Sequence, residues 1–385
     1  MAKNSLSDKI IQSEIRNMSI ECAKVNGINL SQGFSDTEIN HIISSAAKKA
    51  IDLGNNHYTR FDGTTEIRNV LSEKLKAYNK ITADPEDNII VTNGSTAALF
   101  CILYALLRQG EEVLLFEPYY GYHLNTILVL NLLPKYFELS FKENWSIDFE
   151  KLRKSITPNM KAIILNTPTN PSGKVFTREE IYEICKIAKE KNIYLITDEI
   201  YEYFLYDGVE HVSPGSYNEF KDTVITIGGY SKTFSITGWR IGYIVCDIKY
   251  KETIGFVHDL MYVCAPAPLQ SGVAAGIKLL TVKFYNELKN SYSKKREIIC
   301  TALSNCGLNP IIPKGAYYVL ADISRVPGRN SKERVINILN KTGVASVPGV
   351  AFSSTSQGEY MARFCFAKKD LILFEAAERL RLLNL

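Results

Sequence analysis

Residues 225–240 read Ile225-Thr226-Ile227-Gly228-Gly229-Tyr230-Ser231-Lys232-Thr233-Phe234-Ser235-Ile236-Thr237-Gly238-Trp239-Arg240. The first residues are apolar and β-branched, which predicts a buried strand. Two glycines end that strand and permit a tight turn. Lys232 follows the turn at once, which suits a pocket, and Arg240 follows a Gly-Trp pair that should hold it near Lys232. Two exposed cations at an ordinary strand end are the alternative that the residue types leave open.

Similar apolar runs recur along the chain, separated by helical stretches. Strands are predicted at 28–34, 88–92, 112–117, 161–165, 193–197, 241–246 and 361–366, with a further one beginning at Gly315. Helices are predicted at 7–26, 97–107, 178–191 and 284–305, the last leading into a smaller domain. This alternation indicates a mainly parallel sheet covered by helices on both faces. Ligands of such sheets bind beyond the C-terminal ends of the strands.

The composition indicates a soluble globular protein, with 46% apolar and 22% charged residues in a chain of 385. A net charge of +4 is too balanced to favour nucleic acid or a membrane surface as a partner. No apolar run is long enough to span a bilayer. The eight scattered cysteines form no C-x-x-C pair and are expected to be buried free thiols, which fits a cytoplasmic location. The five histidines show no metal-ligand spacing, so no metal site is predicted.

Three strings of polar residues follow predicted strands. Asn93-Gly94-Ser95-Thr96 precedes a helix, whose first free amides and dipole could hold an anion, although many such turns bind nothing. Asn166-Thr167-Pro168-Thr169-Asn170-Pro171-Ser172-Gly173 is typical of a rigid loop. In Asp198-Glu199-Ile200-Tyr201, a carboxylate at the end of an apolar strand is costly unless it has a partner. A helix N-cap or a structural salt bridge is the alternative role for Asp198.

These strings and the Lys232 segment resemble, in this order, the motifs of class I/II aminotransferases, the fold-type-I enzymes that use pyridoxal phosphate (PLP). The resembling motifs run from about Asn29 to Ala367. The resemblance implies an α/β fold, with a mainly parallel seven-stranded sheet between helices in a large domain, plus a smaller α+β domain. It places an N-terminal arm and part of the small domain at 1–45, the large PLP-binding domain at 46–285 and the small C-terminal domain at 286–385.

The resemblance also implies where the cofactor is attached and how its phosphate is held. Lys232 would carry PLP as a Schiff base. Arg240 would grip the phosphate, together with a cup formed by Gly94, Ser95 and Thr96.

The contacts to the PLP ring follow from the same resemblance. Tyr120, the second residue after a proline, would stack on the pyridine ring. Asn170 and Tyr201 would contact the 3-oxygen, and Asp198 would pair with the protonated ring nitrogen. Gly229 stands where family members often have a hydroxyl that binds phosphate, as it does in some members with a similar lysine segment.

Substrate and partner contacts complete the implied site. Arg363, an arginine alternating with aromatic residues, would clamp the substrate carboxylate, with Gly33 and Asn170 beside it. A snorkelling surface arginine is the alternative. The spacing of Tyr58, Gly63 and the following Arg resembles a motif whose tyrosine reaches the PLP phosphate of a partner subunit, which implies a homodimer.

The activity implied is that of an aminotransferase moving an amino group between an L-amino acid and a 2-oxo acid. A neutral or aromatic amino acid is expected, because the string 28–34 resembles members acting on kynurenine, methionine, glutamine or aromatic substrates. Thr96 also replaces a lysine that pairs with the distal carboxylate in some aspartate-specific relatives. A PLP-dependent side-chain lyase or cyclase of the same fold is the first alternative, and a PLP-binding regulatory domain is the second.

Overall fold

The computed structural model describes residues 13–143 and 145–385. Within them the central sheet has seven strands, in the spatial order β2-β8-β7-β6-β5-β3-β4. The strands are β2 (Ile89–Thr92), β3 (Glu112–Glu117), β4 (Leu133–Glu138), β5 (Met160–Asn166), β6 (Tyr194–Asp198), β7 (Val224–Gly229) and β8 (Gly242–Val245). β8 is antiparallel to both of its neighbours, and the other pairs are parallel. The expected mainly parallel seven-stranded sheet is therefore confirmed.

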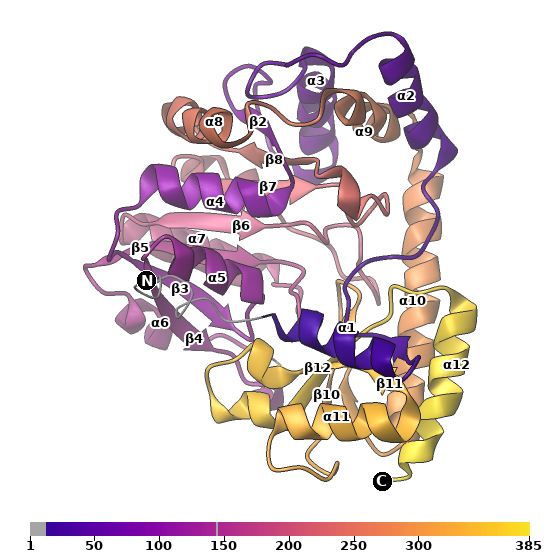
Figure 1. Ribbon diagram of the computed structural model, residues 1–385. Coiled ribbons are helices and arrows are strands. Elements are labelled where there is room, and N and C mark those ends of the chain that lie inside the picture. Colours follow the sequence, from indigo (N-terminus) through magenta and orange to yellow (C-terminus); the bar gives the residue numbers. More distant parts are fainter. Residues whose placement is uncertain (1–12, 144) are drawn as a thin grey trace, which may run out of the picture.

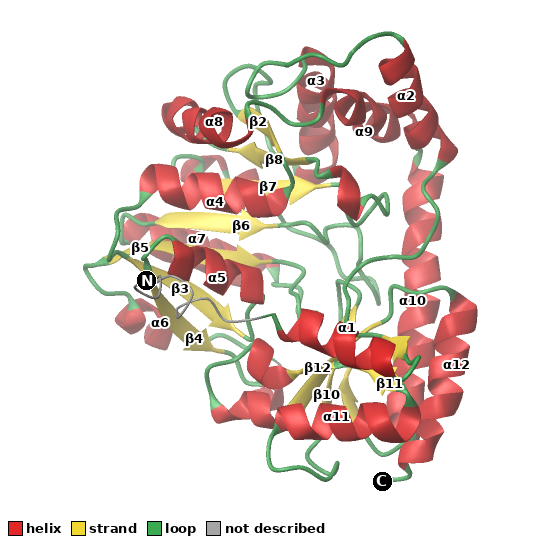
Figure 2. Cartoon of the chain, in the orientation of Figure 1, coloured by secondary structure: helices red, strands yellow, loops and turns green. Residues whose placement is uncertain are grey.

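Helices cover both faces of this sheet (Figures 1 and 2). One face carries α4 (Ser95–Leu106), α5 (Gly121–Val129) and α8 (Ile248–Tyr262), and the other carries α6 (Phe149–Ser155) and α7 (Arg178–Glu190). Successive side chains of a strand point to opposite faces. Ile163 of β5 accordingly packs into the core with α6 and α7, whereas Ile164 packs into the core with α4, α5 and α8. Burial on both faces explains why the central strands are continuously apolar.

A third layer of helices packs at the β2–β8 edge of the sheet. It consists of α2 (His41–Asp52), α3 (Thr65–Lys74) and α9 (Ala267–Leu279). A single π-helical turn at Leu75–Asn79 continues α3. These helices share a core with the edge strands, built on residues such as Ile43, Ile67 and Val273. The loop between α2 and α3 carries Tyr58.

The smaller part of the chain holds a four-stranded sheet in the order β12-β13-β10-β9. Its strands are β9 (Asn309–Ile311), β10 (Tyr318–Asp322), β12 (Val347–Pro348) and β13 (Met361–Cys365). The helix α10 (Val282–Asn305) runs into it from the large sheet's side, and α11 (Ser331–Thr342) and α12 (Asp370–Leu380) cover it (Figure 1). At the N-terminal end, α1 (Glu14–Lys24) and β1 (Ile28–Asn29) also belong here, because β1 pairs with β11 (Val344–Ala345). The domain boundaries remain a prediction.

Three expected elements differ from those in the structure. The helix expected at 7–26 is α1, and residues 1–12 lie outside the described residues. The strand expected at 28–34 ends at Asn29, because the side-chain oxygen of Asn29 accepts hydrogen bonds from the backbone N–H and the hydroxyl of Ser31 and turns the chain. The strand expected from Gly315 begins at Tyr318, because Ala316 has a left-handed φ of 58°.

The cysteines are free thiols throughout the described residues, and most are buried. Cys264 differs from the expected burial, since it is partly exposed and its sulfur accepts a hydrogen bond from the backbone N–H of Thr59. None of the described helices has the length and apolar character that crossing a membrane requires.

Candidate active site

The polar residues that follow the parallel strands lie along one edge of the large sheet. Asn166 and Asp198 end β5 and β6 and are paired in register. Gly229 ends β7 beside them, with Lys232 three residues later. This C-terminal edge is where ligands of open α/β sheets bind.

Asp198 is a buried carboxylate with a histidine as its partner. Its side chain has Oδ2 3.0 Å from Nε2 of His123, whose ring N–H donates, while Oδ1 accepts from the backbone N–H of Ile200 at 3.2 Å. The His123 ring meets the Tyr120 ring edge-on, with centroids 5.2 Å apart. Sequence reasoning missed His123, although its position three residues after Tyr120 at the start of α5 places both side chains on one helical face. Among the described residues Asp198 pairs with no lysine or arginine, and its partner is the His123 ring.

Lys232 is partly buried, and two other cations, Arg240 and Arg363, lie close enough to act on its amine. Its Nζ donates to the backbone oxygen of Gly33 at 3.0 Å. Burial lowers the pKa of Lys232 to about 8, and the positive charges of Arg240 and Arg363 act in the same direction, against Asp198. A larger fraction of this amine is therefore neutral near pH 7–8 than for a lysine in water.

Arg363 is 1% exposed, so the surface role is wrong. It reaches the site from β13, where Nη1 donates to Oδ1 of Asn170 at 2.9 Å and Nη2 donates to the backbone oxygen of Ser31 at 2.6 Å. Within the described residues its Nε has no hydrogen-bond partner, and the partners of its guanidinium are an amide and a backbone oxygen, not a carboxylate. The rings of Tyr318 and Phe352 lie 4.3 Å and 4.8 Å from the guanidinium carbon. A buried guanidinium that lacks a carboxylate partner within the chain is suited to bind the carboxylate of a ligand.

Arg240 and the start of α4 form a cradle for an anion. Gly94 precedes α4 with a φ of 84° and offers the helix no side-chain cap. A Cβ at Gly94 would lie 2.5 Å from Nη2 of Arg240, which shows how closely the guanidinium approaches the start of α4. Ser95 and Thr96 begin the helix at the same point. The expected proximity of Arg240 to this cup is thus present in the structure.

The tyrosines around the site form a hydrogen-bonded and aromatic wall. The Tyr201 and Tyr318 hydroxyls lie 2.9 Å apart, and burial raises the pKa of Tyr201 well above its ordinary value. Burial likewise raises the pKa of Tyr120, whose ring lines a small pocket shared with Asn170. Tyr318 was not singled out from the sequence. It also leaves no space beside Gly33, where a Cβ would come within 1.9 Å of its hydroxyl.

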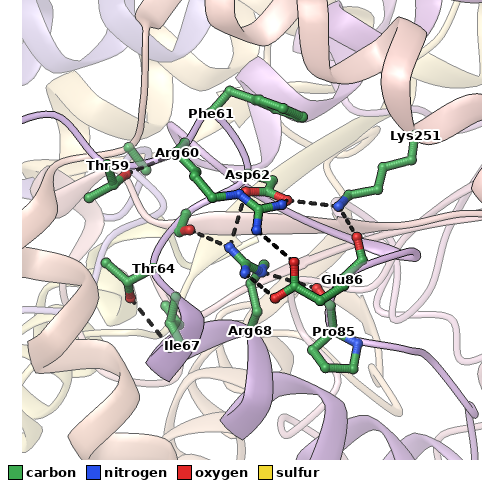
Figure 3. Close-up of polar contacts among 12 residues, drawn as sticks. Thr59, Arg60, Phe61, Asp62, Thr64, Ile67, Arg68, Pro85, Glu86 and Lys251 are labelled. Carbon is green, nitrogen blue, oxygen red and sulfur yellow. Dashed lines mark hydrogen bonds and ion pairs between the residues drawn. The ribbon is translucent and has the colours of Figure 1, made fainter.

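Tyr58 does not join this group within the chain, since it is 83% exposed on the α2–α3 loop. The base of that loop is fixed by a buried ion network (Figure 3). Asp62 accepts from Arg68 at 3.1 Å and from Lys251 at 2.7 Å. The loop therefore projects Tyr58 outward from a rigid base.

Comparison with known proteins agrees with this geometry. The model of the family "Aminotransferase class I and II" matches residues 25–380. The chain is 31% identical to a kynurenine–oxoglutarate transaminase of Dictyostelium discoideum, over 93% of this chain and 91% of that protein. It is 32% identical to an aspartate aminotransferase of Pyrococcus abyssi, over 99% and 97%. The solved structure of N-succinyldiaminopimelate aminotransferase from Mycobacterium tuberculosis matches with a TM-score of 0.95 at 28% identity, covering 99% of this chain and 100% of that one.

The chain therefore belongs to the class I and II aminotransferases, the PLP-dependent enzymes of fold type I. It is a PLP-dependent transaminase whose substrates are amino acids and 2-oxo acids.

Proposed function

We propose that this transaminase uses Lys232, Asp198, Asn170 and Arg363 as its working residues and takes a neutral or aromatic L-amino acid as donor. One observation carries the proposal. A lysine with a lowered pKa, a buried carboxylate that pairs with no lysine or arginine, and a guanidinium without a carboxylate partner converge on one sheet edge among the described residues. Unmatched buried charges of both signs are costly unless a ligand completes them.

The donor set at this edge fits PLP. The cradle of Arg240 and Gly94 at the start of α4, with Ser95 and Thr96, suits a phosphate. The buried carboxylate of Asp198 suits a protonated ring nitrogen. Bound PLP supplies an electron sink for the electrons left when the substrate's α-proton departs. Tyr120, Asn170 and Tyr201 complete the proposed ring contacts.

Lys232 is proposed both to attach the cofactor and to move the α-proton. Its amine acts as a base only when neutral, and burial favours that form. Asp198 must remain ionised to hold a proton on the ring nitrogen, and the N–H of His123 supports the charged carboxylate. Arg363 holds the substrate carboxylate, using the unpartnered Nε and the Nη atoms that contact Asn170 and Ser31.

Two observations support the donor class. The rings of Tyr318 and Phe352 lie beside Arg363, and Thr96 offers no charge to a distal carboxylate. The experiment is to supply a panel of L-amino acids with 2-oxoglutarate and to quantify the new amino acid and the new 2-oxo acid together. Equal amounts of both, with aromatic or neutral donors turned over faster than aspartate, would support the proposal. Preference for aspartate would overturn the donor class, and ammonia release would indicate elimination instead.

A homodimer is proposed from an exposed apolar face. Tyr58 is 83% exposed, Leu260 84% and Phe256 59%, and Phe256 contacts Phe61 of the Tyr58 loop. Apolar groups gathered in this way mark an interaction surface. A second copy would cover it and allow Tyr58 to reach the phosphate cup of the partner. A purely monomeric protein in sedimentation at full activity would contradict this assembly. The free thiols support the proposed cytoplasmic location.

A further inference from the structure

A short segment, residues 31–36, lies over the candidate active site and is held there through its backbone oxygens. We call it the strap. Ser31 O accepts from Arg363, and Gly33 O accepts from both Lys232 and Tyr317, each at 3.0 Å. Phe34 O accepts from Nζ of Lys368 at 3.3 Å. Four side-chain donors, Arg363, Lys232, Tyr317 and Lys368, therefore contact backbone oxygens of the strap.

Two of these donors have other roles in the proposed function. Arg363 would bind the substrate carboxylate and Lys232 would attach the cofactor, so both would share their donor atoms between the strap and a ligand in the loaded site. Tyr317 and Lys368 have no such role. Of the four donors, these two would keep their contacts to the strap when substrate is bound.

Lys368 is an unusual residue, because it is a lysine that is 6% exposed and forms no ion pair with any described residue. Buried lysines are nearly always paired. Its ammonium instead lies 3.9 Å from the centroid of the Phe34 ring, which is a cation–π contact. Its backbone is also fixed, since Lys295 donates to Lys368 O and pairs with Asp370 at 2.6 Å. The cation is thus aimed at the strap from a rigid base.

We propose that Lys368 is a positioning residue that holds the strap closed over bound substrate through the ring and the backbone oxygen of Phe34. The proposal rests on the function proposed above. Lys368 itself touches neither the cofactor nor the reacting atoms. Its loss should weaken amino-acid binding without changing how the cofactor is held.

The test compares four variants of the cofactor-loaded protein. Lys368→Met removes the cation but keeps an apolar stem, and Lys368→Arg keeps a cation. Phe34→Leu removes the ring from the other side of the contact. Lys369→Met is the matched control, because Lys369 is the adjacent lysine and is exposed. Each variant is measured by hydrogen exchange of the amides at 30–36 and by the amino-acid concentration that half-saturates the change in cofactor absorbance.

Lys368→Met should speed exchange in the strap and raise the half-saturating concentration by roughly threefold to tenfold, as expected for a lost cation–π contact. The maximal rate should change less. Lys368→Arg should restore most of the binding, and Lys369→Met should match wild type. Phe34→Leu should give the same effects, and the double variant Lys368→Met/Phe34→Leu should add little more.

Unchanged exchange and half-saturation in Lys368→Met would overturn the proposal, as would fully additive effects in the double variant. If Lys368→Met fails to fold, Phe34→Leu still decides it, because Phe34 is 40% exposed and its loss spares the core. If no amino acid alters the cofactor absorbance of the wild type, the proposed function fails. The exchange measurement would then still decide whether Lys368 holds the strap.

Discussion

Two clusters of buried charge in this molecule are built in opposite ways. In the ion network below the Tyr58 loop (Figure 3), Arg68 and Asp62 are fully buried. Arg68 pairs with Asp62 at 3.1 Å and with Glu86 at 2.5 Å, and Lys251 pairs with Asp62 at 2.7 Å. In the candidate active site, Arg363 and Lys232 instead donate to backbone oxygens and an amide.

The contrast separates charges that hold the fold from charges that await a ligand. A buried pair whose partners are both present is self-contained, and removing one partner leaves an uncompensated charge. A buried cation bonded to neutral oxygens can exchange those weaker contacts for an anionic ligand. Changes in the ion network should therefore affect stability, whereas changes in the active site should affect binding and rate.

Lys232→Ala should have the largest effect on activity. Turnover should fall by about 10³-fold or more, because a positioned base alone contributes roughly 10²–10⁴-fold and the attachment point is lost as well. The melting temperature should not fall, since among the described residues Lys232 makes one hydrogen bond, to Gly33 O. Steady-state kinetics and thermal unfolding of the same preparation check both parts. Normal steady-state activity would remove the assignment of Lys232.

Asp62→Asn should have the largest effect on stability. Breaking a buried charge pair costs about 3–5 kcal/mol of unfolding free energy. The matched control is Arg60→Met, because Arg60 pairs with the same Asp62 but its side chain is 53% exposed. That change should cost less than about 1 kcal/mol. Denaturant unfolding of both variants gives the comparison, and equal losses would show that burial does not separate the two pairs.

Asp198→Asn should leave the cofactor bound but slow α-proton exchange by roughly 10²-fold or more, the scale of losing one electrostatic group in a closed site. A neutral amide cannot keep a proton on the ring nitrogen. Exchange of the substrate's α-proton with deuterium in solvent reports this step alone. A rate equal to wild type would end the proposed role of Asp198.

The smallest effect is expected from the lowered pKa of Lys232, which should shift the pH dependence of PLP uptake and of stability. Attachment of PLP would require the neutral amine of Lys232, so the rate at which cofactor-free protein takes up PLP should rise with pH and level off above about 8. The stability of the cofactor-free protein should also rise with pH between about 8 and 10.4, because the unfolded lysine binds the extra proton in that window. An uptake rate that still climbs steeply beyond pH 9 would contradict the lowered value.

Local patterns in the sequence were enough to predict the sheet and the residues at its edge. β3 occurs at the predicted residues, and Asp198 and Asn166 end the strands that their apolar runs predicted. Each of these predictions depends on neighbours within one strand and its following turn. Burial of Arg363 was expected on the resemblance alone, since an arginine among aromatic residues can also be at the surface.

The contacts that complete the site come from residues far apart in the sequence. His123 reaches Asp198 across 75 positions, and Lys368 reaches Phe34 across 334. The partners of Asp62 are likewise spread over α3 and α8. Only the folded chain brings such groups together. The role of Tyr58 stays a prediction, because its proposed contact lies in a second subunit.

The buried guanidinium of Arg363 is proposed to bind the substrate's α-carboxylate. Amino-acid titration of the cofactor absorbance in wild type and in Arg363→Ala tests this proposal directly. Charge-assisted hydrogen bonds contribute about 1.5–3 kcal/mol each, so the half-saturating concentration should rise at least about tenfold for every α-amino acid tested. The cofactor spectrum should be unchanged, and Arg363→Lys should recover only part of the loss. Equal half-saturation in wild type and Arg363→Ala would place the substrate carboxylate elsewhere and make Arg363 a structural residue of β13.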